Sequence, residues 1–236
     1  MLRWVLAQHR ILFWMVLFSQ VLMGIGAAFM YRLYLGQLDP LVAAYLVSGI
    51  PALSIIPVGF VMVPIQVIGE KSRGSHEFTW SLPVPRLAPV AAVFTVYATV
   101  AIPVAALSTA LAAWQFGASL QPTLLALPAA LLVSLMATSV GYGLAMAIPE
   151  PRITNLILNV VIFVVLLFSP IVIPIERFPD WAATVHRVLP FFHMSNLVRG
   201  TVTQGLAVEL WASAGVLLAW TTAGWAAVVR VVTRRP

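Results

Sequence analysis

Residues 41–68 read LVAAYLVSGIPALSIIPVGFVMVPIQVI, an apolar run that contains no Asp, Glu, Lys or Arg. A helix needs about 20 mainly apolar residues to cross the roughly 30 Å hydrocarbon core of a bilayer, so this run predicts a membrane-spanning helix. Pro51, Pro57 and Pro64 lie within it, and each removes a backbone donor and can kink the helix. The predicted bends are either static or belong to a flexible helix that changes shape between an inward-open and an outward-open conformation.

Five other runs share this apolar character, so the sequence predicts an all-α integral membrane protein with six transmembrane helices. The first run is too long for a signal peptide, whose apolar core spans about 7–15 residues. We find no repeat or linker and expect a single transmembrane domain over residues 1–236. The six predicted spans are Ile11–Tyr31, Leu41–Ile68, Pro89–Trp114, Thr123–Ile148, Ile153–Ile173 and Leu206–Val229.

Composition supports the same class. Hydrophobic residues make up 61% of the 236 residues and charged residues 8%, whereas soluble domains are about 25% charged. A soluble enzyme and a nucleic-acid-binding protein are thereby excluded, and the net charge of +6 fits basic cytoplasmic loops beside membrane lipids. The chain has no cysteine, so disulfides and thiolate metal sites are excluded.

Basic residues in the loops predict the orientation, because cytoplasmic loops are enriched in Lys and Arg. With the N-terminus inside, nine basic residues lie on the inner side and four on the outer side. We therefore expect a multi-pass plasma-membrane protein with both termini in the cytoplasm. The inner set is Arg3, Arg10, Lys71, Arg73, Arg86, Arg152, Arg230, Arg234 and Arg235, and the outer set is Arg32, Arg177, Arg187 and Arg199.

Several chemistries lack their motifs. Glu70 precedes the only lysine, Lys71, so the chain has no nucleotide-binding P-loop, and the metal-binding H-E-x-x-H and the nucleophile motif G-x-S-x-G are also absent. The predicted span centres carry no charged residue, which argues against ion-coupled transport. The neutral polar residues within the predicted spans either form hydrogen bonds between helices or line a path for a transported substrate. Candidates for a pathway or dimer face are Gln20, Asn155 and Asn159, the last two on one face of the fifth span.

The predicted inner loop at residues 69–86, GEKSRGSHEFTWSLPVPR, has the highest density of polar residues in the chain. Ser75 is suited to cap a short helix that runs to about Leu82, where Pro83 and Pro85 would end it. This loop is either an ordinary juxtamembrane segment with an interfacial Trp or a docking site for a soluble partner.

The predicted outer segment contains SPIVIPIERFPDW at residues 169–181 and VLPFFHMSNLVRG at residues 188–200. It is too charged to span the membrane and too apolar for a solvated loop. Short re-entrant helices fit this composition, because irregular backbone at membrane depth must be buried in protein or line water. The breaks are expected at Pro170, Pro174, Pro179 and Pro190.

These two segments on six spans resemble the ABC-2 type permease family, the membrane subunits of type-2 ABC exporters. The inner loop begins with Glu and a basic residue and ends Leu-Pro-x-Pro-Arg, as in the family. Residues 1–10 are shorter than the N-terminal interfacial helix of many members, and Pro170 replaces the usual Gly of the outer pattern. That pattern is matched at Ser169, Pro174, Glu176, Pro179, Trp181, Pro190 and Arg199.

The resemblance implies a permease subunit that exports a hydrophobic or amphipathic compound such as an antibiotic, a drug or a lipid-like molecule. The chain itself would be no enzyme and hold no cofactor; ATP and Mg²⁺ would bind two separate nucleotide-binding subunits. A second permease subunit, identical or a sister, would complete the path. Coupling to the ATPase would fall to Glu70, Arg73, Ser75, His76, Glu77 and Phe78, and the extracellular gate to Pro174, Glu176, Arg177, Pro179, Trp181, Pro190 and Arg199.

Two other functions remain open. A membrane-embedded lipid-modifying enzyme would use His76, His186 or His193 as an acid or base, although these residues are predicted on opposite sides of the membrane. A channel or secondary carrier is compatible with proline-kinked spans but not favoured by their uncharged centres.

Overall fold

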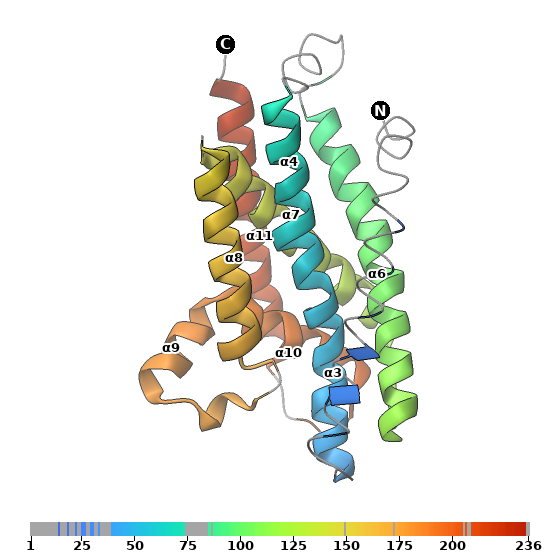
Figure 1. Ribbon diagram of the computed structural model, residues 1–236. Coiled ribbons are helices and arrows are strands. Elements are labelled where there is room, and N and C mark those ends of the chain that lie inside the picture. The colour runs from blue at the N-terminus through green and yellow to red at the C-terminus, as the bar shows by residue number, and fades with distance from the viewer. Residues whose placement is uncertain are drawn as a thin grey trace.

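The computed structural model describes residues 39–73, 85, 87–148, 150–171, 173–204, 206 and 209–234, with the single positions 14, 18, 22, 25, 26, 29, 30 and 33. Within these residues the protein is all-helical, as predicted. The helices run back and forth along one bundle (Figure 1). They are α3 Pro40–Pro57, η1 Val58–Met62, α4 Val63–Ser72, α6 Ala88–Phe116, α7 Ala126–Ala147, α8 Pro151–Phe168, η2 Ile175–Arg177, α9 Asp180–Val188, α10 Pro190–Val202 and α11 Leu210–Arg234.

Four of the described helices are long and apolar enough to cross a membrane, so the chain is a membrane protein. They cover the predicted second, third, fourth and sixth spans, and the shorter α8 covers the fifth. The predicted first span, residues 11–31, lies almost entirely outside the described residues. The four are Pro40–Ser72, Ala88–Phe116, Ala126–Ala147 and Leu210–Val232.

The predicted fifth span is too long at its C-terminal end. Helix α8 ends at Phe168, with Ser169 as its cap, rather than at Ile173. Proline disfavours helical backbone at the residue before it, so Pro170 places Ser169 in an extended conformation. Residues beyond Pro170 therefore belong to the segment that leads into α9 and α10.

Helices α3, η1 and α4 form one continuous rod. A five-residue π-helix, Val58–Met62, lies between Pro57 and Pro64. Proline cannot donate a backbone hydrogen bond, and wider π turns accommodate such interruptions inside a helix. The helix type thus changes between Pro57 and Pro64, whereas Pro51 lies within α3.

Helix α7 packs against α11 and against η1, and glycines allow the closest contacts. A Cβ on Gly141 would overlap the carbonyl oxygen of Gly59, and one on Gly224 would lie 2.8 Å from the Ser139 Oγ. Small residues at interfaces let membrane helices approach until their backbones touch. The core therefore relies on backbone contact as much as on side-chain packing.

The two ends of the bundle differ (Figure 1). Helices α9 and α10 lie at one end, which we call the α10 end. The last residues of α4 and α11 and the first of α6 lie at the other, which we call the C-terminal end. The predicted re-entrant segment and the predicted coupling loop therefore belong to opposite ends.

Candidate functional site

Helix α10 starts at Pro190. Proline suits the first turn of a helix because the N–H that it lacks would have no partner within the helix there. Its side chains are buried over most of its length. The ring of Phe191 lies 5.3 Å from that of Phe60 in the π-helix. The short helix is thus held inside the protein and touches the rod formed by α3, η1 and α4.

Arg199, near the end of α10, is 1% exposed. Its Nε donates to the Ser48 Oγ at 3.1 Å, one terminal nitrogen to the Asn196 Oδ1 at 3.0 Å and the other to the Ile171 carbonyl oxygen at 2.9 Å. The guanidinium also lies 3.7 Å above the centroid of the Tyr45 ring. These bonds tie α10 to α3 and to the turn after α8.

Gly49 makes part of this arrangement possible. A Cβ at this position would lie 2.8 Å from the Ile171 carbonyl oxygen. The absence of a side chain lets the turn after α8 approach α3 and places that oxygen within reach of Arg199. A glycine in α3 is therefore required by the same contact that satisfies the buried guanidinium.

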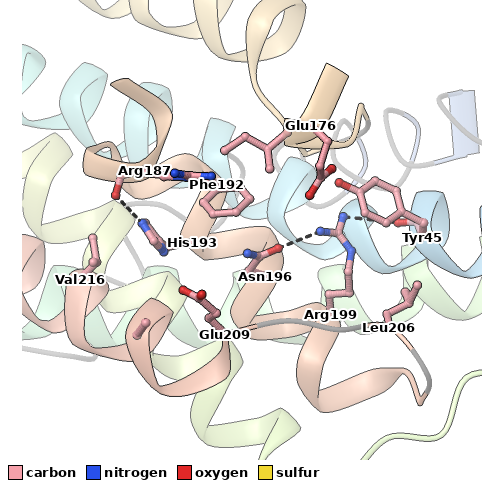
Figure 2. A pocket seen from close by; sticks show the side chains of 12 residues that line it. Tyr45, Glu176, Arg187, Phe192, His193, Asn196, Arg199, Leu206, Glu209 and Val216 are labelled. Carbon is pink, nitrogen blue, oxygen red and sulfur yellow. Dashed lines mark hydrogen bonds between the residues drawn. The ribbon is translucent and has the colours of Figure 1, made fainter. Parts of the chain in front are cut away.

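A cavity of about 570 Å³ opens beside Arg199 at the α10 end (Figure 2). We call it the α10 pocket. Its residues come from α3, η2, α9, α10, the segment between α10 and α11, and the first turns of α11, so the walls are distant in sequence. Ile175, Phe192, Leu206, Ala212 and Val216 supply its apolar lining, and its polar lining is Tyr45, Glu176, Arg187, His193, Asn196, Arg199 and Glu209.

His193 braces the pocket wall. Its Nε2 lies 2.8 Å from the Arg187 carbonyl oxygen, and its Nδ1 lies 3.1 Å from the Ser213 Oγ. A carbonyl oxygen only accepts hydrogen bonds, so Nε2 carries a proton and donates. The imidazole thereby links α9, α10 and α11 and has both nitrogens engaged.

The two carboxylates of the pocket are less engaged. Neither Glu176 nor Glu209 has a side-chain hydrogen bond or an ion pair within the described part of the chain, although Glu176 interacts electrostatically with Arg199. Asn196 is 7% exposed; its Oδ1 accepts from Arg199, while its Nδ2 has no partner among the described residues. In Figure 2 Asn196 lies between Glu209 and Arg199.

His186, on α9, lies outside the pocket lining and is also buried. Its Nδ1 has no hydrogen-bond partner in the described structure, and its ring contacts that of Phe178 at 5.5 Å. Burial lowers the pKa of His186 below its usual value, and a hydrogen bond with the Phe168 backbone opposes that shift. This imidazole is part of the packing between α9 and the end of α8.

The residues predicted as the gate separate into three groups. Glu176 and Arg199 line the pocket. Pro174, Pro179 and Pro190 lie at the starts of η2, α9 and α10, where the breaks were expected. Arg177 and Trp181 are exposed, Trp181 by 74%.

Sequence reasoning missed Tyr45, Asn196 and Glu209 as pocket residues. Tyr45 sits in one predicted span and Glu209 near the start of another, Leu206–Val229, so only the fold brings them together; in the structure α11 begins after Glu209, at Leu210. One signal was present: Tyr45 and Ser48 are three residues apart and share a helix face, and both contact Arg199. Asn196 lies one turn before Arg199 in α10.

The C-terminal end has its own polar contacts. The Lys71 Nζ donates to the carbonyl oxygens of Ala145, Met146 and Ile148, at the end of α7. The Glu70 carboxylate accepts from the Gln66 amide at 3.0 Å, and Arg73 caps α4. The other predicted coupling residues, Ser75, His76, Glu77 and Phe78, lie outside the described residues.

The predicted pathway residues Asn155 and Asn159 lie on an exposed face of α8, where the Asn159 Nδ2 donates to the Asn155 carbonyl oxygen at 2.8 Å. Bulky apolar residues surround them on that face, including Leu156 and Phe163. Gln20 lies outside the described residues.

An apolar helical bundle with a polar pocket at one end places the chain among polytopic membrane proteins, in the class that includes transport subunits. The family model described as ABC-2 type transporter matches residues 3–203. The chain belongs to the ABC-2 type transporter family and is thus a membrane component of an ABC transporter, a family whose members work with ATPase subunits. A comparison with curated proteins gave no match.

Proposed function

We propose that this chain is the permease subunit of an ATP-driven exporter that moves a hydrophobic or amphipathic compound out across the plasma membrane. Two separate nucleotide-binding subunits bind ATP and Mg²⁺ and hydrolyse the nucleotide. A second permease subunit, identical or a sister, completes the path. The chain crosses the membrane six times with both termini in the cytoplasm.

The observation that carries this proposal is the family match over residues 3–203 in a chain without a P-loop. A transporter of this family needs nucleotide hydrolysis, and a chain without the phosphate-binding loop depends on a partner for it. The cytoplasmic loop at residues 69–86 is the contact we propose for that partner. Glu70, Arg73, Ser75, His76, Glu77 and Phe78 are its coupling residues.

Contacts at the C-terminal end support this assignment. The side chain of Lys71 is bonded to the last carbonyl groups of α7, so the base of the loop is fixed to a second helix. The Gln66 Oε1 also accepts a hydrogen bond of 2.6 Å from the Tyr97 hydroxyl of α6. A force on the loop would therefore reach α4, α6 and α7 together.

The α10 pocket supports the assignment of an extracellular gate. The α10 end consists of short helices joined by buried polar contacts. Such helices can move apart while each keeps its own backbone hydrogen bonds, so no unpaired backbone group is exposed to lipid. Glu176 and Arg199 face this pocket from different elements. We assign Pro174, Glu176, Arg177, Pro179, Trp181, Pro190 and Arg199 to the gate region.

The exposed face of α8 supports a second permease subunit. Amide side chains are costly in hydrocarbon when their hydrogen-bonding groups lack partners. Asn155 and Asn159 therefore suit a helix face that meets protein or a path rather than lipid alone. In the complete exporter we place this face toward the second subunit, and Gln20 is a further candidate for the same role.

Purification of the tagged chain from its native membranes tests the proposal. We expect a Walker-motif ATPase to co-purify and its ATP hydrolysis to rise in the complex. Glu77→Arg or Phe78→Arg should abolish that coupling while the chain still folds, whereas Glu176→Gln should change transport without affecting assembly. A chain that transports without any ATPase, driven by an ion gradient, would instead establish a secondary carrier.

A further inference from the structure

We propose that the α10 pocket binds an organic cation, in the form of a primary ammonium group carried on an apolar body. The inference rests on the proposed transport function, because it names the class of compound that the gate region recognises. The pocket volume of about 570 Å³ falls within the range of ordinary small-molecule sites.

The acceptors for such a group are Glu176 and Glu209. Glu176 lies in η2 and Glu209 directly precedes α11, and both side chains line the same cavity (Figure 2). An ionised carboxylate only accepts hydrogen bonds, and an ammonium group only donates them. Within the described residues neither carboxylate is occupied by an internal donor, so their capacity is open to a ligand.

The buried cation of the pocket offers little to an anionic ligand. A guanidinium has five N–H donors. Arg199 directs four of them to Ser48, Asn196, the Ile171 carbonyl oxygen and, at 3.5 Å, the Tyr45 carbonyl oxygen. Its charge is also faced by Glu176. An anionic ligand would therefore depend mainly on Arg187, which is exposed, as are Glu176 and Glu209, and would also face these two carboxylates.

The remaining lining suits the apolar body of the ligand. Phe192 lies on α10, Val216 on α11 and Leu206 between these helices, and Figure 2 shows the three spread around the pocket. An aromatic face also attracts cations within about 6 Å, so Phe192 favours a positively charged ligand over a neutral one. Asn196 is 7% exposed, and its Nδ2, which has no partner among the described residues, adds a fixed donor that orients any acceptor on the ligand.

Three probes with one apolar body test the charge preference: 3-phenylpropylamine, 3-phenylpropanol and 3-phenylpropionate. Their binding to the full chain in phosphatidylcholine nanodiscs is measured by ligand-observed NMR, after subtraction of the signal from empty nanodiscs. We expect the amine to bind at least tenfold more tightly than the alcohol or the carboxylate. Equal binding of the three, or a preference for the carboxylate, would overturn the inference.

Charge-removing variants test the site. Glu209→Gln should weaken binding of the amine about tenfold, which corresponds to about 1.4 kcal/mol, and leave binding of the alcohol unchanged. Asp180→Asn is the matched control, because Asp180 is an exposed carboxylate on neighbouring α9 that does not line the pocket. Glu176→Gln provides a second test if Glu209→Gln fails to fold. Weakening by Asp180→Asn to the same degree, or none by the folded pocket variants, would refute the site.

The ammonium could belong to a soluble compound or to a phosphatidylethanolamine headgroup. Nanodiscs that contain this lipid separate the two sources: competition with the amine probe identifies the headgroup, and retained affinity identifies a soluble ligand. Either result supports an ammonium site. Amine binding is measured without an ATPase, so it can be separated from the ATP hydrolysis of the co-purified complex. Amine binding without stimulated ATP hydrolysis would refute the transport function alone. Stimulated hydrolysis without amine binding would refute this inference alone.

Discussion

The guanidinium carbon of Arg199 lies 3.7 Å above the centroid of the Tyr45 ring, and these residues come from helices separated by most of the chain. The contact combines a cation–π interaction with hydrogen bonds to neutral oxygen atoms. It fixes α10 against α3 at the edge of the α10 pocket. The geometry of the pocket therefore depends on one buried cation.

Arg199→Lys should destabilise the protein although it keeps the charge. Lysine cannot reproduce the planar, stacked and branched contacts of arginine, and each lost bond to a charged group costs about 1.5–3 kcal/mol. We expect the free energy of unfolding in detergent to fall by about 2 kcal/mol. Arg177→Lys, at an exposed position, is the control and should change it by less than about 0.5 kcal/mol.

Gly224→Ala should destabilise the bundle, whereas Gly215→Ala should not. Both glycines lie in α11, but a Cβ at Gly224 would be 2.8 Å from the Ser139 Oγ, and one at Gly215 would meet nothing within 4 Å. Overpacking costs about 1–3 kcal/mol, while alanine in an open helical position gains up to about 1 kcal/mol. Thermal unfolding of the two variants checks this difference. Equal effects would contradict the close contact between α7 and α11.

Lys71→Met should loosen the C-terminal end. The ammonium group satisfies carbonyl groups at the end of α7, where a cation also interacts favourably with the helix dipole. We expect a loss of about 1–2 kcal/mol in stability and a lower ratio of transport to ATP hydrolysis in the assembled transporter. Arg230→Met, an exposed cation in α11, should leave both unchanged.

Stability should fall as the pH drops below about 6.5, and His186 should account for part of the loss. Burial lowers the pKa of His186 in the folded protein, so the unfolded chain binds more protons between that lowered pKa and about 6.5. Unfolding is therefore favoured by acid in this window. Melting temperatures at pH 7.5 and 5.5 measure the effect, which His186→Gln should reduce. An unchanged pH dependence in that variant would assign it to other groups.

Much of the fold follows from apolar run length and from proline positions. Leu41–Ile68 and Pro89–Trp114 could be predicted as helices because each is a continuous apolar run long enough to span a membrane, and a helix satisfies its backbone hydrogen bonds within the same segment. The prolines at 174, 179 and 190 mark the starts of η2, α9 and α10, because proline has no N–H to donate and is better tolerated at the start of a helix than in its interior. The exact end of α8 depended on Pro170, whose effect reaches back only one or two residues.

The pocket could be predicted only in part. Glu176 and Arg199 belong to a recognisable segment, but Tyr45 and Glu209 join them through tertiary packing that no local pattern encodes. The burial of Arg199 likewise depends on Gly49, whose role is to let a distant turn approach. Such long-range contacts leave no periodic trace in a single sequence.

The π-helix between Pro57 and Pro64 gives the rod formed by α3, η1 and α4 a place where the helical register can change. One π turn holds a surplus residue relative to the α-helix around it, and moving that surplus along the rod rotates the displaced part by about 100° and shifts it by about 1.5 Å. Gly59 packs against Ala137 and Gly141 of α7 with no room for a Cβ, so the π turn lies where η1 and α7 approach each other most closely. A rotation of α4 relative to α3 would displace Phe60, whose ring contacts Phe191 at the start of α10.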